Sequence, residues 1–326
     1  MRISGTIESC AMTDCAIVTG GAGFIGSHLV DALLAEGTRV AVIDDLSSGD
    51  ARRIADGADF HHLDIVNRDA LDAVVDEIAP HAIFHLAAQS SVTVSVADPA
   101  RDCAVNVQGT LNVLEAATRH RVPLVFTSTG GALYGDEAPI PTPEDRIPAP
   151  LAPYGASKWA GEAYVKTWAA ASGIPHAVCR LGNVYGPRQS PHGEAGVVAI
   201  FTHHLHTGRS PKIFGHGRPT RDYVHVTDVA AALRAASGVA GTFNVATGVE
   251  TDVMTVWNVL LQASGADVVP TLAPLREGEL QRSCMDPSCA RRELGWEARI
   301  ALEQGLHDTY NALVAEFERA EAQQVG

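Results

Sequence analysis

The stretch CAIVTGGAGFIG, residues 15–26, decides the fold of this 326-residue chain. It begins with a short apolar run that is typical of a buried strand. It ends in a segment, 24–36, whose apolar residues have helical spacing. Glycines at positions 20, 23 and 26 permit a tight turn and close approach of a phosphate to the backbone. Because a helix N-terminus offers N–H donors and a positive dipole end, the stretch predicts a strand–turn–helix unit that binds the pyrophosphate of a dinucleotide.

An acidic pair, Asp44 and Asp45, follows the next predicted strand, residues 38–43. An acid at this place can accept hydrogen bonds from the 2′-hydroxyl of an adenosine ribose, and it would repel a 2′-phosphate. No arginine directly follows Asp44. The pattern therefore favours NAD over NADP as the cofactor, the alternative being two acids in an exposed turn.

Strand-like and helix-like segments alternate through the first half of the chain. Further strands are expected at 59–63, 82–87, 124–128 and 177–181, and helices at 69–78, 99–121 and 154–172. Repeated β-α-β units of this length predict an α/β fold of the Rossmann type, with a doubly wound parallel sheet. Beyond residue 183 the pattern loosens, and helices near 226–237, 255–264 and 301–322 indicate a smaller second lobe.

The composition narrows the classes of function. The chain has 38 acidic and 24 basic residues and a formal net charge of −14, which disfavours nucleic acid and anionic membranes as partners. Its six cysteines contain no CxxC pair, so we expect free thiols and no metal site. No signal peptide and no long uncharged apolar segment is visible. We expect a soluble, cytoplasmic protein.

Tyr154 and Lys158 are four residues apart in a predicted helix, so both project from one face. A nearby cation lowers the pKa of a phenol, and such a tyrosine can take a proton from a substrate hydroxyl. Thr129 ends a predicted strand, where ligands bind in open α/β sheets, and its hydroxyl could contact the same substrate oxygen. The alternatives are an ordinary surface pair for the first two and a helix cap or turn for the third.

Seven features in a fixed order resemble the extended short-chain dehydrogenase/reductase superfamily. They are the glycine turn, Asp44, the Asp-Ile pair at 64–65, LAAQ at 86–89, Asn106, the hydroxyls at 128–129 and YxxxK. RLGNVYGPRQ at 180–189, RDYVHV at 221–226 and REGEL at 276–280 resemble nucleotide-sugar 4-epimerases. The similarity runs from about residue 14 to 315. It implies three parts: a flexible extension at 1–13, an NAD-binding domain at 14–182 that includes the Tyr154/Lys158 helix, and a mainly nucleotide-sugar-binding lobe at 183–326.

The resemblance assigns catalytic roles to Tyr154, Lys158 and Thr129, and it implies NAD as the cofactor. Lys158 would bond the nicotinamide ribose and keep Tyr154 anionic. The other implied cofactor contacts are Gly20, Gly23, Phe24, Ile25 and Gly26 at the pyrophosphate, Asp44, Asp45, Ser47, Ser48 and Gly49 at the adenosine ribose and its phosphate, Asp64 and Ile65 at adenine, and Leu86, Ala87, Ala88, Gln89 and Asn106 on the nicotinamide side.

The resemblance also implies a UDP-sugar substrate. A diphosphate needs cationic partners, which arginine supplies in bidentate form. The implied substrate contacts are Ser90, Thr129 and Tyr154 at the sugar, Asn183, Arg221 and Arg276 at the diphosphate, Glu279 at the uridine ribose, and Val198, Lys212 and Phe214 at the base. A homodimer formed by the helices at 99–121 and 154–172 is also implied.

The reaction implied is epimerisation at C4. Tyr154 would remove the proton of the sugar O4 while a hydride passes from C4 to NAD, and the flat 4-keto sugar would turn over before the hydride returns. Gly130 and Gly131 follow Thr129 where dehydratases and decarboxylases carry acids, so neither of those reactions is expected. A non-catalytic NAD-binding sensor is the different class to test, and the intact catalytic set argues against it.

The identity of the sugar is ranked from two features. Ser283, which follows Arg282, is small where galactose epimerases often carry tyrosine, so substituted hexoses would fit. The chain as a whole resembles UDP-glucuronate 4-epimerases of actinobacterial antibiotic pathways. We therefore rank UDP-glucuronate to UDP-galacturonate first, narrowly ahead of UDP-glucose to UDP-galactose, with UDP-N-acetylglucosamine third.

Overall fold

The computed structural model describes residues 14–192, 196–276 and 279–325. Its centre is a seven-stranded sheet in the order β3-β2-β1-β4-β5-β6-β11, in which every neighbouring pair is parallel. The strands are β1 (Cys15–Thr19), β2 (Arg39–Asp44), β3 (Ala58–His62), β4 (Ala82–His85), β5 (Leu124–Thr129), β6 (Ala177–Leu181) and β11 (Gly241–Val245). The strand order reverses between β1 and β4, which confirms the predicted doubly wound, Rossmann-type sheet.

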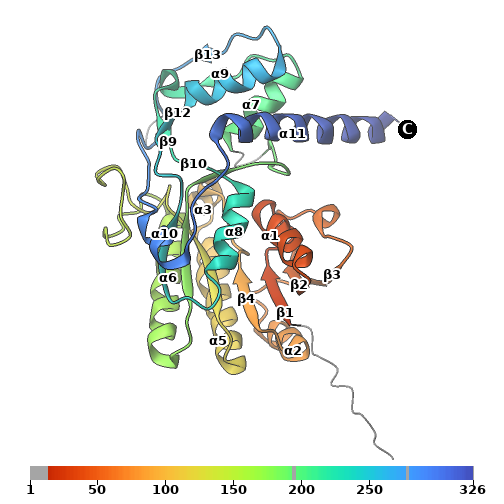
Figure 1. Ribbon diagram of the computed structural model, residues 1–326, viewed down its shortest axis with the longest axis vertical. Helices are drawn as coiled ribbons and strands as arrows, with labels where there is room; N and C mark the ends of the chain where they lie inside the picture. Colours follow the sequence, from red (N-terminus) through yellow and green to blue (C-terminus); the bar gives the residue numbers. More distant parts are fainter. Residues whose placement is uncertain (1–13, 193–195, 277–278, 326) are drawn as a thin grey trace, which may run out of the picture.

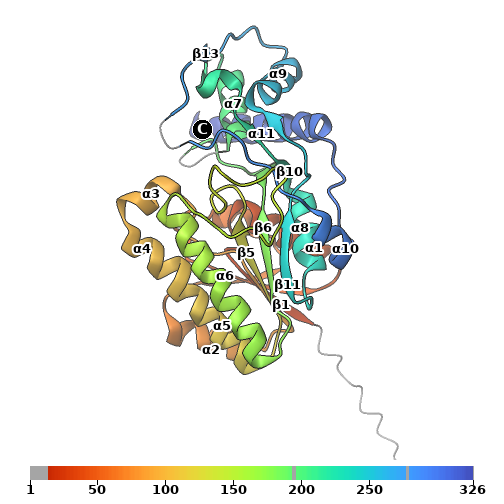
Figure 2. The same cartoon turned by 90° about the vertical axis from the view of Figure 1, so that its left-hand side faces the viewer.

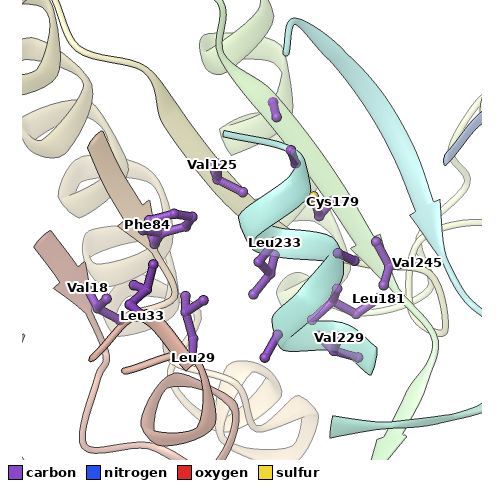
Figure 3. Packing of buried hydrophobic residues seen from close by; sticks show 14 of the residues in the cluster. Val18, Leu29, Leu33, Phe84, Val125, Cys179, Leu181, Val229, Leu233 and Val245 are labelled. Atoms are coloured by element: carbon purple, nitrogen blue, oxygen red, sulfur yellow. The ribbon is translucent and has the colours of Figure 1, made fainter. Parts of the chain in front are cut away.

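Helices cover both faces of this sheet, and two apolar clusters hold the layers together (Figure 1). Side chains alternate along β1, so that Val18 packs under α1 (Phe24–Ala35) and α8 (Val226–Ala235), while Ile17 faces the opposite layer. Figure 3 shows the first cluster, in which Leu29 and Leu33 of α1 lie beside Leu233 of α8. The opposite layer contains α2 (Arg68–Ile78), α5 (Thr110–His120) and α6 (Pro153–Ser172).

The predicted helix at 99–121 is present as three consecutive segments. They are α4 (Pro99–Cys103), a π-helical segment η2 (Ala104–Gly109) and α5. Gly109 ends the wide segment, and a Cβ there would lie 2.5 Å from the Ile65 side chain. The close packing of Gly109 against Ile65 joins residues that are far apart in the sequence, so the helical spacing of apolar residues does not predict it. Figure 2 shows α4, α5 and α6 side by side on one face of the sheet.

The second lobe stands at one end of the sheet (Figure 1). Its core lies between α7 (Val197–His206), α9 (Val253–Ser264) and α11 (Leu302–Val325), where Phe201 packs edge-on against Trp257. Three short strand pairs complete it: β7 (Asn183–Tyr185) with β10 (Tyr223–His225), β9 (Thr220–Arg221) with β12 (Thr251–Asp252), and β8 (Lys212–Ile213) with β13 (Thr271–Leu272).

The chain crosses between the two parts more than once. After the predicted boundary at residue 182, α8 and β11 return to the sheet, where β11 pairs with β6 and α8 packs against α1. Residues 183–326 therefore also complete the cofactor domain. Three further helices have no counterpart in the sequence analysis: α3 (Val92–Ala97), α7 and α10 (Ser288–Leu294). The extension at 1–13 lies outside the described residues.

Two findings bear on the expected surroundings of the protein. Within the described ranges, no helix is both long and apolar enough to cross a membrane. The described cysteines, Cys15, Cys103, Cys179, Cys284 and Cys289, are all free thiols.

Candidate active site

The glycine turn between β1 and α1 has the conformation that the sequence predicts. Gly20 has φ +73°, and a Cβ there would lie 2.6 Å from the backbone nitrogen of Ala87. A Cβ on Gly26 would overlap the carbonyl oxygen of Gly20. At Gly23, by contrast, the nearest atom to an added Cβ would be that same oxygen, at 3.1 Å. Gly20 and Gly26 are thus required by the turn itself, whereas Gly23 leaves room beside the uncapped first amides of α1.

Asp44 ties the end of β2 to this turn. Its carboxylate is buried and accepts hydrogen bonds from the amides of Ala22 (3.0 Å) and Leu46 (2.9 Å). Burial raises its pKa, which the two amides partly oppose. Each carboxylate oxygen can still accept a further bond, as a ribose contact requires. Gly49 permits this geometry, because a Cβ there would lie 2.7 Å from an Asp44 oxygen.

The other predicted adenosine contacts lie in the turns after β2 and β3. Asp45 is exposed and binds the amide and hydroxyl of Ser47, and Ser48 is exposed beside it. Ile65 is buried, and its carbonyl accepts from Asn112, whereas Asp64 is exposed. Together with the glycine turn, these residues lie at the carboxyl ends of neighbouring strands. This is the edge of the sheet where ligands bind in such folds.

The predicted nicotinamide side follows β4 and lies directly against the glycine turn. The amide of Leu86 donates to the carbonyl of Thr19 at 3.0 Å. Ala87 and Ala88 are half-buried beside it, as are Phe24 and Ile25 in the first turn of α1. The structure therefore brings the whole predicted cofactor set to one edge of the sheet.

Asn106 and Gln89 differ from the rest of that set, because their side chains are occupied by protein groups. Asn106 is buried, and its Nδ2 donates to the carbonyl of Gln89 (2.9 Å), to Asp102 (3.1 Å) and to Ser157 (3.1 Å). Gln89 Nε2 donates to Asp102 at 2.8 Å. These two residues position the loop after β4 against α6, so we assign them to positioning and not to direct cofactor contact.

Thr129, Tyr154 and Lys158 converge where β5 ends and α6 begins. The Thr129 hydroxyl hydrogen bonds to the Tyr154 phenol and accepts from the amide of Ala132. The Tyr154 amide donates to Ser95 of α3 at 3.1 Å, which fixes the first turn of α6. Lys158 is buried, with Nζ 4.6 Å from the centroid of the Phe126 ring. The hydroxyl and the phenol are therefore in contact, and the ammonium comes from the next turn of the same helix.

The acidities of this pair differ from the expectation. Burial and, to a lesser extent, the Asp102 charge raise the pKa of Tyr154 to about 12, against the opposing effect of the Thr129 hydrogen bond. Burial lowers the pKa of Lys158 to about 8, against the opposing charges of Asp102 and Glu162. The prediction that Lys158 lowers the pKa of Tyr154 is wrong for the chain's own groups, because desolvation dominates.

A buried polar network supports the end of β5. Ser128 donates to Glu162 at 2.6 Å, and Arg180 binds both oxygens of that carboxylate, at 2.9 and 2.6 Å. Arg180 also donates to the Tyr134 hydroxyl, which donates to Asn244 at 3.1 Å. The network thus connects β5, α6 and β6 to β11, the strand contributed by the second half of the chain. Sequence reasoning missed Glu162, although it lies four residues after Lys158 on one helix face.

The predicted diphosphate clamp is assembled in the second lobe. Arg276 Nε lies 3.0 Å from one oxygen of Glu279, and Arg221 Nη2 lies 3.9 Å from the other. The Arg276 guanidinium lies over the Phe214 ring at 4.4 Å, and Lys212 Nζ is 5.3 Å from the same ring. Two arginines around the Glu279 carboxylate, with Lys212 beside the same Phe214 ring, leave a local positive charge in an acidic chain, which suits an anionic ligand.

The remaining predicted substrate contacts are spread around the opening. Asn183 begins β7, and its Oδ1 would lie 3.6 Å from a Cβ placed on Gly131. Ser90 is exposed after Gln89, and Ser283 is half-buried with its amide bonded to Thr220. Val198 is buried in the core of the second lobe, so its predicted contact with the base would require that core to be opened. Among the described residues, no cluster of three or more metal-ligating side chains is present.

Comparison with known proteins agrees with this geometry. The NAD dependent epimerase/dehydratase family matches residues 16–246. The UDP-glucose 4-epimerase of Mycolicibacterium smegmatis is 47% identical over 302 residues, which cover 90% of this chain and 96% of that protein. The structure of Thermotoga maritima UDP-glucose 4-epimerase with UDP-glucose is 41% identical, with a TM-score of 0.90, and covers 93% of this chain and 99% of that chain. The UDP-glucose 4-epimerase of Thermus thermophilus in complex with NAD is 40% identical, with a TM-score of 0.86, and covers 92% and 98%.

Proposed function

This chain belongs to the NAD dependent epimerase/dehydratase family, and we propose that it interconverts UDP-glucose and UDP-galactose by epimerisation at C4. The observation that carries the proposal is the convergence of Thr129, Tyr154 and Lys158 beside the glycine turn. The family is NAD dependent, which confirms the expected cofactor.

The sequence analysis ranks UDP-glucuronate narrowly first, and the comparisons support its stated alternative, UDP-glucose, better. The relatives named above are UDP-glucose 4-epimerases, and one of the structures holds UDP-glucose. The charges near the sugar end agree, because Arg282, next to Ser283, is paired with Glu250. A C6 carboxylate would need a cation there. Nothing in these relatives supports the antibiotic-pathway expectation.

The residues of the cofactor site fit NAD. Gly23 leaves open space at the uncapped amides of α1, and the Asp44 carboxylate stands where a ribose with free hydroxyls would be accepted. These residues would hold NAD, whose nicotinamide would supply a reversible hydride acceptor for C4 of the sugar.

The chain's own groups account for the proton and for orientation. Tyr154 takes the O4 proton as the C4 hydride leaves, and gives it back when the hydride returns. Thr129 holds the phenol and the same oxygen by hydrogen bonds, and the Lys158 ammonium would bond the nicotinamide ribose. Arg221 and Arg276 hold the diphosphate while the 4-keto sugar turns over. No net oxidation occurs, so one bound cofactor serves both half-reactions.

The test is to incubate the purified protein with UDP-glucose, UDP-N-acetylglucosamine and UDP-glucuronate and to resolve the C4 epimers. We expect turnover of UDP-glucose, and loss of at least about 100-fold in kcat for Tyr154→Phe. Tyr310→Phe is the matched control, because Tyr310 lies half-buried on α11, in a helix that contributes no predicted site residue. Turnover of UDP-glucuronate without UDP-glucose would restore the original ranking. NAD binding without any turnover would favour a sensor.

The helices α5 and α6 are also the surface through which we propose that two copies of the chain associate. Trp159 and Tyr164 of α6 are large apolar side chains that stand exposed on the single chain. Light scattering should give twice the mass of the chain, and Trp159→Glu should give the single mass. A single mass for the unchanged protein contradicts this arrangement.

A further inference from the structure

Two buried carboxylates act on the Lys158 ammonium by their charge, and they come from different helices. Glu162 lies on α6, one turn after Lys158, and Asp102 lies on α4, which packs against α6. Both side chains are almost completely buried, with exposures of 0% for Glu162 and 1% for Asp102. A buried charge is costly unless it is paired, so the partners of each carboxylate decide what it does.

The charge of Glu162 is compensated within its own network. Arg180 binds both of its oxygens, Lys166 Nζ lies 3.4 Å away, and the Ser128 hydroxyl donates to it at 2.6 Å. Arg180 is itself 1% exposed, so this is a fully buried ion pair. Little of the Glu162 charge is left to act on Lys158.

Asp102 receives hydrogen bonds but no compensating charge from its bonded partners. Gln89 Nε2 donates to its Oδ1 at 2.8 Å, and Asn106 Nδ2 donates to the same oxygen at 3.1 Å. Both donors are neutral amides. They hold the carboxylate in place without adding a charge of their own. The buried cation on which this charge acts is Lys158, whose pKa it raises.

The hydrogen bonds of Asn106 bring this carboxylate to the catalytic pair. The Nδ2 that donates to Asp102 also donates to the Ser157 hydroxyl at 3.1 Å. Ser157 precedes Lys158 and donates in turn to the carbonyl of Tyr154 at 3.0 Å. Asp102 and the first two turns of α6 are thus separated by a single amide group.

We propose that Asp102 is a positioning residue whose carboxylate is the counter-charge of the Lys158 ammonium and keeps that ammonium charged in the closed, water-poor site. This rests on the proposed role of Tyr154 and Lys158 in the epimerase. The side-chain amides of Gln89 and Asn106 then hold the Asp102 carboxylate in place without neutralising its charge.

The groups that face Lys158 from the neighbouring elements determine the direction in which its pKa shifts. Asp102 of α4 and Glu162 of α6 both raise its pKa, with Asp102 the larger of the two. His85 of β4 adds no positive charge at neutral pH, because burial and Lys158 itself lower its pKa to about 3. From β5, Thr129 and the Phe126 ring contribute no net charge. Removing the Asp102 charge must therefore lower the pKa of Lys158, and that of Tyr154 with it.

The experiment is an NMR titration of the full-length, NAD-saturated protein labelled with ε-¹³C lysine. The chain has three lysines, so Lys158 is assigned with Lys166→Arg and Lys212→Arg variants. The expected midpoint for Lys158 is about 8 in the unchanged protein. In Asp102→Asn it should fall by about one pH unit, the usual size of a close opposite charge. Asp98→Asn is the matched control, because Asp98 caps the same helix from an exposed position and should leave the midpoint unchanged.

The titration needs no turnover, so it separates this inference from the proposed reaction. An unchanged midpoint in folded Asp102→Asn overturns the inference, even if epimerase activity is confirmed. If Asp102→Asn does not fold, the double variant Asp102→Asn/Lys158→Met decides, since removing both charges leaves neither uncompensated. A double variant more stable than Asp102→Asn supports the pair. A double variant that also fails to fold assigns Asp102 to loop structure and contradicts the inference.

Discussion

The two regions that we propose to hold phosphates are built in opposite ways. The cofactor region uses backbone amides and glycines of the central sheet, and the turn proposed to hold its pyrophosphate directly follows β1. The substrate region uses the charged side chains of Arg221, Arg276 and Glu279, which extend from short strands and loops of the second lobe. The first region is fixed by the fold, whereas the second is fixed by its own ion pairs. Substitutions should therefore affect folding in one region and substrate affinity in the other.

The largest effect is expected at the glycine turn. Gly20→Ala places a Cβ 2.6 Å from the Ala87 nitrogen in a residue with φ +73°, so it should cost about 3 kcal/mol of unfolding free energy or prevent folding. Gly23→Ala should cost about 1 kcal/mol or less but weaken NAD binding at least about tenfold, because its Cβ enters the phosphate space. Urea unfolding and NAD titration measure the two. Equal stability losses would show that Gly23 is also structural.

The glycine turn and the strands around it show which parts of the fold can be predicted from the sequence. The strands at 15–19 and 177–181 were predicted residue for residue, because a local apolar run between turn signals is enough to specify them. The return of β11 to the sheet was not predicted, because it depends on contacts such as Tyr134 with Asn244, which are 110 residues apart. Long-range pairing leaves no local signal in one sequence.

The residues of the candidate site also divide into those that local spacing predicts and those that it does not. Asp44 and the Tyr154/Lys158 pair follow from spacing within one element or one turn. Asp102 was missed, although it lies four residues before Asn106, because a lone acid in a helix usually faces solvent. The relatives do not support the ranking of UDP-glucuronate over UDP-glucose. That ranking used the size of Ser283, whereas the charges beside Ser283 depend on the pairing of Arg282 with Glu250.

The second largest effect is expected at the arginines of the second lobe. Arg221 is much less exposed than Arg276, with side-chain exposures of 16% and 62%. A charged bond that is shielded from water is worth more, so Arg221→Met should raise KM for the UDP-sugar about 30-fold and Arg276→Met about fivefold. Initial rates at varied substrate measure this. Neither variant should alter NAD affinity; a shared loss would show that the two regions are coupled.

A smaller effect is expected at Asp44, where a substitution tests the preference for NAD over NADP and not the affinity for the cofactor. Asp44→Asn removes the charge that would repel a 2′-phosphate, so the preference for NAD over NADP should shrink about tenfold. Fluorescence titration with both cofactors measures the ratio. Asp45→Asn is the matched comparison, because Asp45 is exposed and engaged by Ser47. If Asp45→Asn relaxes the preference equally, the ribose contact belongs to the turn as a whole.

The smallest effect is expected at the exposed pair of the second lobe, Glu250 and Arg282. Their hydrogen bond, with that from Thr220, holds the pKa of Glu250 below its usual range. A carboxyl with a lowered folded-state pKa stabilises the fold above its unfolded pKa, and that stabilisation is lost as the pH falls through the lowered value. Glu250→Gln should therefore lower the melting temperature by no more than about 2 °C at pH 7, with the difference vanishing in acid. Since Thr220 precedes Arg221, a rise in KM beyond about threefold would instead show that this pair positions the diphosphate clamp.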